Sequence, residues 1–152
     1  MSEHRASIEW SREGDFVYEK YSRQHVWRFE GGVSVTGQAA PANIPKTAPS
    51  GAGVDPEQAF VAAISSCHML WFLNLACQRK FVVERYVDDA VGVLDGTWMS
   101  KVTLRPRVSF SGKAPSDDEH RALHHMAHEK CFIANSVKSE VLVEPTIARE
   151  AA

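Results

Sequence analysis

The sequence predicts an α+β fold in which short β-strands lie on either side of one long, buried central helix. Short runs rich in aromatic and β-branched residues, separated by glycine or polar breaks, fill the first third of the chain and return in its second half. Between them, the stretch from Ala59 to Cys77 carries no charged residue. A chain of 152 residues, 44% of them hydrophobic, has the size and composition of one globular domain. We therefore expect a single domain over residues 1–152.

The first third is expected to form strands joined by turns. Four strands are predicted, over Ile8–Trp10, Phe16–Tyr18, His25–Phe29 and Val33–Thr36. The pair Gly31-Gly32 lies between the last two runs and indicates a hairpin turn. Residues 38–54 contain three prolines and two glycines, so we expect a loop. A loop of this length inside a compact domain favours a covering or binding segment over a domain boundary.

A helix is predicted to begin directly after this loop. Asp55 can cap it, Pro56 suits its first turn, and Glu57 is favoured at the positive end of the helix dipole. A helix that is apolar on nearly every face is a buried one. The stretch also reaches the minimum length of a membrane span, but it is interrupted by polar residues, namely Ser65, Ser66, His68 and Asn74. We expect no membrane partner, and a homodimer whose second subunit helps to cover the helix.

Strands are predicted to return after this helix, followed by a second helix. The expected strands are Val82–Val87, Ala90–Leu94 and Ser100–Phe110, with a last strand over Val141–Ile147. Asp95-Gly96 marks a turn, and Pro106 suggests an edge or a bulge. Ser116 is expected to cap the second helix, whose first turn is acidic.

Charge and cysteine content bound the function classes. A formal net charge of -2 gives no electrostatic reason to expect nucleic acid or an anionic membrane as a partner. The first ten residues lack a basic segment followed by an apolar run, so we do not expect a secretory signal. An odd number of cysteines, three, then argues for reduced thiols in the cytoplasm.

Cys67 is the most informative residue for function. It lies in the middle of the apolar helix beside serines and a histidine, and it is either an inert buried thiol or a reactive one. Cys131 follows the second helix and could bridge Cys67 only if the fold brings their Cα atoms within about 7 Å. Cys77 lies about 15 Å from Cys67 along a helix axis, too far for a bridge. We expect a structural role for Cys77.

Arg23 and Glu57 are the polar candidates for activating a thiol. A nearby arginine favours the thiolate, and a carboxylate can hold the guanidinium by paired hydrogen bonds. Each also has a simpler interpretation, Glu57 as a helix-start residue and Arg23 as an exposed strand residue. Glu57 lies about 15 Å from Cys67 on a straight helix. Either the helix breaks after its first turn, or the pocket combines residues of two subunits. His25 is a candidate to line that pocket beside Arg23.

The histidine-rich segment HHMAHEKC admits a metal site. His124 and His128 share a helix face, and Cys131 follows at plausible ligand spacing. The alternative is a solvated polar face, and no fourth ligand is evident, so we predict no metal. His68 directly follows Cys67, and its side chain is expected to point about 100° away, which makes it a poor direct base.

Three segments resemble the OsmC/Ohr family (osmotically inducible protein C / organic hydroperoxide resistance). They are YSRQHVWRFEGG, VDPEQAFVAAISSCHMLWFL and HEKCFIANS, and the resemblance extends from about residue 6 to 147. The middle segment, with its D-P-E-Q start and S-x-C in one helix, is the most specific. The resemblance implies an OsmC-like fold: an intertwined homodimer of α+β subunits, each with a long central helix wrapped by antiparallel sheets. Its active sites would lie at the subunit interface.

The resemblance also implies roles for particular residues. Cys67 matches the family's peroxidatic cysteine and Cys131 its resolving cysteine, while Glu57 matches the glutamate of the P-E-Q segment. Arg23 is the match for the activating arginine, with Arg12 as the alternative. The Ohr branch tends to have a proline directly after the second cysteine, where this chain has Phe132. The chain is more similar to the OsmC-like branch.

The activity implied is that of a thiol-dependent peroxidase in oxidative stress defence. Such an enzyme reduces organic hydroperoxides to alcohols through a Cys67 sulfenic acid and a Cys67–Cys131 disulfide, which an external dithiol reduces, and it needs no cofactor. The apolar neighbours Phe60, Leu70, Trp71 and Phe132 would suit an organic hydroperoxide better than hydrogen peroxide, although helix packing alone also explains them. The alternative function is a non-enzymatic thiol or metal-binding dimer on the same fold.

Overall fold

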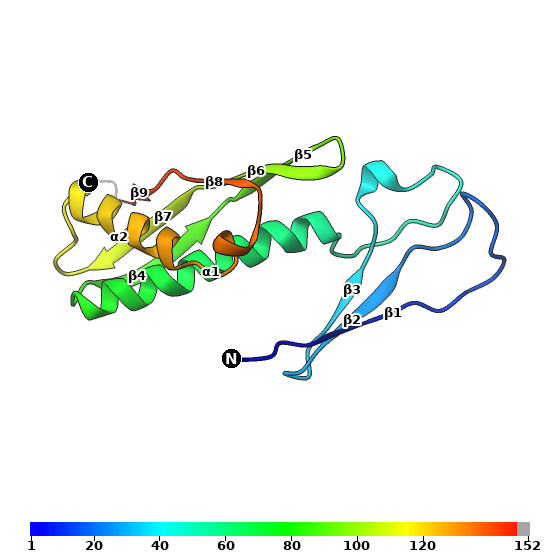
Figure 1. The fold of residues 1–152 in the computed structure, drawn as a ribbon, viewed down its shortest axis with the longest axis horizontal. Coiled ribbons are helices and arrows are strands. Elements are labelled where there is room, and N and C mark those ends of the chain that lie inside the picture. The colour runs from blue at the N-terminus through cyan, green and yellow to red at the C-terminus, as the bar shows by residue number, and fades with distance from the viewer. Residues whose placement is uncertain (149–152) are drawn as a thin grey trace. The chain divides into compact units, whose positions relative to one another are not determined.

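The computed structural model describes residues 1–148, and it confirms the predicted α+β class (Figure 1). The chain divides into two compact units, Met1–Ala59 and a second that begins at Phe60. The expectation of one domain over residues 1–152 stays a prediction. The elements are β1 (Ala6–Glu9), β2 (His25–Phe29), β3 (Ser34–Gly37), η1 (Pro41–Asn43), α1 (Pro56–Gln78), β4 (Val82–Asp88), β5 (Val91–Asp95), β6 (Trp98–Leu104), β7 (Pro106–Ser111), α2 (Asp117–Lys130), η2 (Ala134–Ser136), β8 (Glu140–Val143) and β9 (Thr146–Ile147).

The first unit is built on the antiparallel sheet β1-β2-β3. The predicted hairpin joins β2 to β3, and Gly32 takes a left-handed φ of 79°, a conformation that glycine adopts without strain. The predicted strand over Phe16–Tyr18 is wrong. Phe16 instead packs its ring against Trp10 and Tyr21, at centroid distances of 5.7 and 4.9 Å. Its aromatic character therefore reflects a local ring cluster and not strand pairing.

Helix α1 begins where the sequence predicts. Asp55 accepts a hydrogen bond from the backbone N–H of Gln58 at 2.7 Å, and the Gln58 side chain accepts from the backbone N–H of Asp55 at 3.4 Å. This reciprocal arrangement satisfies two amide groups that a helix start leaves free. The helix then runs without a break to Gln78. Of the two alternatives that the sequence left open for Glu57 and Cys67, a helix broken after its first turn is therefore excluded.

Within a single chain α1 buries one face, and the expectation that a second subunit covers the rest stays a prediction. The buried side chains recur at helical spacing and are Ile64, His68, Phe72, Leu75 and Ala76. On another face, Leu70 is 60% exposed. Helix α1 is long and apolar enough to cross a membrane by length and composition, a test that core helices of soluble proteins also pass.

The second unit holds two three-stranded sheets, β4-β7-β9 and β5-β6-β8, each with one antiparallel and one parallel pairing. The predicted strand Ser100–Phe110 is two strands, because the chain leaves β6 at Arg105 and enters the other sheet at Pro106. The predicted strand Val141–Ile147 is likewise two, β8 and β9, with Pro145 between them. Proline has no N–H for a strand ladder, which suits such a break. The predicted turn at Asp95-Gly96 is confirmed.

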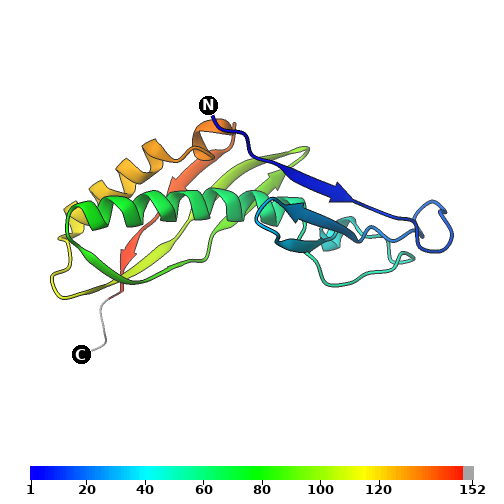
Figure 2. The ribbon, with the colours of Figure 1, turned by 90° about the horizontal axis from the view of Figure 1, so that it is seen from below.

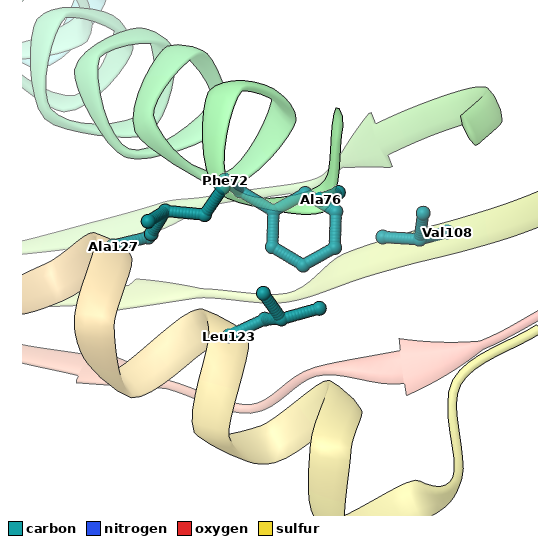
Figure 3. Packing of buried hydrophobic residues seen from close by; sticks show 6 residues of the cluster. Phe72, Ala76, Val108, Leu123 and Ala127 are labelled. Atoms are coloured by element: carbon teal, nitrogen blue, oxygen red, sulfur yellow. The ribbon is translucent and has the colours of Figure 1, made fainter. Parts of the chain in front are cut away.

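Helix α2 begins with the predicted cap at Ser116, which forms a full capping box with Glu119. Helices α1 and α2 pack against β4 and β7 (Figure 2). In the core between them, Phe72 and Leu123 point toward one another beside Val108 (Figure 3). A second cluster is formed by Ile64, Val102 and Leu104. The first cluster fixes α1 and α2 relative to each other, and the second packs α1 against β6 and the segment after Cys131.

Candidate active site

Two thiols meet in the second unit. Cys67 lies midway along α1 and Cys131 directly follows α2, and the two thiols lie close enough to interact. Both are free thiols. The Cys131 sulfur is fully buried, 3.9 Å from the carbonyl oxygen of Ile64, and accepts the N–H of Ala134 at 3.4 Å. The fold therefore supplies the proximity of the two cysteines that the sequence could not establish.

The two thiols differ in their surroundings. Burial raises the pKa of the Cys131 thiol to about 11, and the N–H of Ala134, which acts in the opposite direction, does not offset this. Cys131 is accordingly a protonated thiol at neutral pH. Cys67 is only half-buried. Of the two, Cys67 is the sulfur that a molecule from solvent can reach.

An apolar cavity of about 260 Å³ opens onto Cys67. Its lining is Cys67, Leu70, Trp71, Asn74 and Phe132. The rings of Trp71 and Phe132 meet edge to face with centroids 5.5 Å apart. Such walls favour a small molecule with an apolar body, whose polar end could face the sulfur.

The predicted substrate-binding residues are only partly gathered here. Trp71 and Phe132 line the cavity, whereas Phe60 packs against the cluster around Ile64. Their part in substrate binding stays a prediction. Asn74 was noticed in the sequence only as a polar interruption of the helix. It is two turns beyond Cys67, a spacing that places both on one helix face and that could have identified it.

Arg23 and His25 lie in the first unit, where they make local contacts with each other and with neighbouring aromatic side chains. The Arg23 guanidinium stacks on the Tyr21 ring, 4.3 Å from its centroid. The indole N–H of Trp27 donates to Nε2 of His25 at 2.6 Å. Nε2 is then an acceptor, so the ring proton is on Nδ1 and donates to the Arg23 carbonyl oxygen at 2.8 Å. Arg12, the alternative arginine, is exposed and donates to the Gly14 carbonyl at 2.7 Å.

Glu57 carries an unsatisfied group. Its Oε2 atom is buried and has no hydrogen-bond partner in residues 1–148. No ion pair joins Glu57 to Arg23 in the described part of the chain. A buried carboxylate oxygen without a partner is costly. Helical rise along the unbroken α1 puts Glu57 about 15 Å from Cys67.

The HHMAHEKC segment does not assemble a metal site. His124 points inward to other histidines, while the exposed His125 faces Glu129 at 3.5 Å. Cys131 interacts with Cys67 and not with these histidines. Across residues 1–148, no group of three side chains of the metal-binding types is placed to hold an ion. Cys77, expected to be structural, is exposed at the end of α1 in the single chain.

Comparisons with known proteins place the chain in a family. The model of the OsmC-like protein family matches residues 49–146. An OsmC-like protein of unknown function from Vibrio cholerae is 46% identical, with a TM-score of 0.90 over 96% of this chain and 100% of that one. An organic hydroperoxide resistance protein OsmC from Legionella pneumophila is 19% identical, with a TM-score of 0.63 over 98% and 100% of the two chains.

A third solved structure, the organic hydroperoxide resistance protein OhrB of Bacillus subtilis, is 17% identical with a TM-score of 0.58, over 95% of this chain and 98% of that one. At these lower identities the likeness shows the fold alone. No curated protein matches the chain. The family match spans both cysteines and most of the chain, and the Vibrio protein resembles it over nearly its whole length. The chain belongs to the OsmC-like protein family.

Proposed function

We propose that this protein is a cytoplasmic, thiol-dependent peroxidase that reduces organic hydroperoxides to alcohols in oxidative stress defence. The observation that carries the proposal is the pair of free thiols, one buried and one lining an apolar cavity. Several solved structures with this fold are named organic hydroperoxide resistance proteins, which supports the same assignment.

The reaction follows from the positions of the two sulfurs. The Cys67 thiolate attacks the distal peroxide oxygen, the O–O bond breaks, and the alkoxide takes up a proton and leaves as an alcohol. Cys67 is then a sulfenic acid. The Cys131 sulfur attacks the Cys67 sulfur, a disulfide forms, and water leaves with the Cys131 proton. An external dithiol reduces the disulfide by exchange and is itself oxidised.

Cys131 is suited to the second step and not to the first. Its raised pKa keeps it protonated, and it lies behind Cys67 and not at the cavity. A protonated, buried thiol does not compete for peroxide, because the thiolate is the nucleophile. It reacts when Cys67 has become a sulfenic acid, an electrophile within reach. The order of the two steps therefore follows from burial.

Activation of Cys67 is assigned to Arg23 and Glu57 in a homodimer. Arg23 would stabilise the thiolate and Glu57 would hold the guanidinium. The orphaned Oε2 of Glu57 supports a partner from outside the single chain, and so does the exposed apolar surface of α1 around Leu70. A second subunit supplies both the cover and the missing charge.

The apolar cavity supports a preference for organic peroxides. Trp71 and Phe132 offer contact to an alkyl or aryl group, which hydrogen peroxide lacks. Burial of apolar surface contributes about 25 cal/mol per Å², so a cumyl group gains what hydrogen peroxide cannot. We expect this gain to appear in KM and in kcat/KM.

The test is consumption of cumene hydroperoxide by the purified protein with dithiothreitol as the dithiol. Hydrogen peroxide is run beside it, and Cys77→Ser on the same helix is the matched control for Cys67→Ser. Consumption that requires Cys67, survives Cys77→Ser and prefers the organic peroxide supports the proposal. Equal consumption by Cys67→Ser would remove it.

A further inference from the structure

Three buried histidines form a hydrogen-bonded row across the two helices, which we call the imidazole ladder (His68, His124 and His120). Nε2 of His68 lies 2.9 Å from Nδ1 of His124, and Nε2 of His124 lies 3.2 Å from Nε2 of His120. Their exposures are 0%, 1% and 2%. The proposed reaction uses none of them. A fully buried polar row of this kind calls for a physical reason, since apolar side chains would fill the same space.

The ladder consists of neutral rings. Burial lowers the pKa of His124 to about 2 and that of His68 to about 4, and it also lowers the pKa of His120. Each neutral imidazole has one N–H and one lone pair, so each ladder bond joins one donor to one acceptor. The Phe72 ring stacks on the His124 ring with centroids 4.1 Å apart, which restricts rotation of the imidazole. The arrangement is directional in a way that apolar contacts are not.

The ladder joins the two helices that carry the cysteines. His68 is the residue after Cys67 on α1, and His124 lies about two turns before Cys131 on α2. Slippage of α2 along α1 by one turn would move Cys131 by about 5.4 Å. A disulfide tolerates no such shift, because its Cα atoms must be about 4.4–6.8 Å apart. The relative register of the helices therefore decides whether the two sulfurs can bond.

We propose that the His68–His124 hydrogen bond is a positioning device that sets the register of α2 on α1 and thereby favours the Cys67–Cys131 disulfide. His68 and His124 are positioning residues, since neither contacts a reacting atom. The physiological role of this device rests on the proposed peroxidase function. Its test does not, because the disulfide can be formed without any peroxide.

The test is a redox equilibrium with glutathione. Oxidised glutathione and the two protein thiols give the Cys67–Cys131 disulfide and two molecules of reduced glutathione, and alkylation followed by mass measurement gives the fraction oxidised. Two substitutions of His124 each keep one of its two hydrogen bonds and remove the other. In His124→Asn the amide replaces Nδ1, which faces His68, and in His124→Gln it replaces Nε2, which faces His120.

We expect His124→Asn to keep an equilibrium constant within about twofold of wild type, because the bond to His68 survives. His124→Gln should lower it by about three- to tenfold, the worth of one buried hydrogen bond. His68→Gln, whose amide replaces Nε2, should restore most of what His68→Leu loses. His125→Leu, at an exposed position of the same helix, should leave it unchanged.

Equal equilibrium constants for His124→Asn and His124→Gln would overturn the positioning role, whatever their stabilities. Failure of the wild type to form the disulfide in oxidised glutathione would also overturn it. Absence of peroxidase activity together with the expected order of the variants contradicts only the proposed function and leaves the positioning role standing.

Discussion

Cys67 and Cys131, both in the second unit, lie close enough to interact, whereas Arg23 and Glu57, both in the first unit, form no ion pair in the described chain. The second unit brings its chemical groups together by its own packing: two helices, their core and the imidazole ladder. The first unit leaves a buried carboxylate oxygen unsatisfied. Under the proposed function, the contrast predicts that the disulfide step needs one chain only, while thiolate activation needs a second subunit.

The largest expected effects come from the thiol pair. Cys67→Ser should abolish peroxidase activity, because a hydroxyl is a far weaker nucleophile than a thiolate. Cys131→Ser should permit one turnover and leave a sulfenic acid, which dimedone labelling detects. Repeated turnover of Cys131→Ser with dithiothreitol would show that the buried partner is dispensable and would break the assignment of the second step.

The activating pair tests the other half of the comparison. Glu57→Gln and Arg23→Met should each lower kcat/KM by about tenfold or more, since one pKa unit on the thiol changes the thiolate fraction tenfold near neutral pH. Alkylation of Cys67 at neutral pH, which requires the thiolate, should slow in both variants. Arg12→Met is the control for the choice of arginine. If only Arg12→Met loses activity, the assignment of Arg23 is wrong.

Assembly from two subunits gives a sharper version of the same test. Cys67→Ser homodimers should be inactive and Arg23→Met homodimers should show the loss given above. Mixed dimers should exceed both if one site uses groups of both chains. Gel filtration and mass measurement confirm the mixing. No recovery in confirmed mixed dimers would place all groups of a site in one chain.

Acid should destabilise the protein through the imidazole ladder. The unfolded chain binds protons at its histidines below about pH 6.5, whereas in the folded protein burial holds the pKa of His68 at about 4 and that of His124 at about 2. The free energy of unfolding should therefore fall from about pH 6.5 downward, by up to about 1.4 kcal/mol per pH unit for each histidine. Denaturant unfolding measured between pH 7 and 4.5 checks this.

Other ionisable groups face the ladder and belong in that titration: His128 beside His68, Tyr86 beside His124, and Asp117 and Arg121 beside His120. Replacing His68 with Leu should reduce the acid slope by about one proton. An unchanged slope in that variant would assign the acid sensitivity to other groups.

The smallest expected effects concern the support of α1. Asp88 accepts hydrogen bonds from the Ser65 hydroxyl at 2.5 Å and from the Arg105 backbone N–H at 2.6 Å. Ser65→Ala should lower the free energy of unfolding by about 1 kcal/mol. Asp118→Asn, at an exposed ion pair with Arg121, should change it by less than about 0.5 kcal/mol. Thermal and denaturant unfolding compare the two.

Local signals in the sequence identified most elements correctly. The start of α1 at Asp55-Pro56 and the cap at Ser116 were predictable because side-chain capping depends on neighbours within a few residues. The strand predicted at Phe16–Tyr18 failed because aromatic residues pack in ring clusters as readily as in sheets. Long-range pairing was the missing information.

The candidate site shows the same limit. Cys67 and Cys131 could be named from the resemblance, but their proximity depends on how α1 and α2 pack, which no local pattern encodes. The ladder escaped notice for the same reason. His120 and His124 stand four apart on one helix, a spacing that fits a solvated face as well as a buried one. Only the contact with His68, a long-range contact, shows that this helix face is buried.

The chain passes from one sheet of the second unit to the other twice, at Pro106 and at Pro145, and the two crossings lie side by side. Arg105 and Glu144, the residues before Pro106 and Pro145, pair at 3.0 Å, so β8 and β9 follow β6 and β7 from one sheet to the other. One short final segment thereby covers an open edge of both sheets at once. Without β8 and β9, one edge of β6 and one edge of β7 would be unpaired, and each edge is a template for aggregation, so this short segment protects the molecule from its own copies.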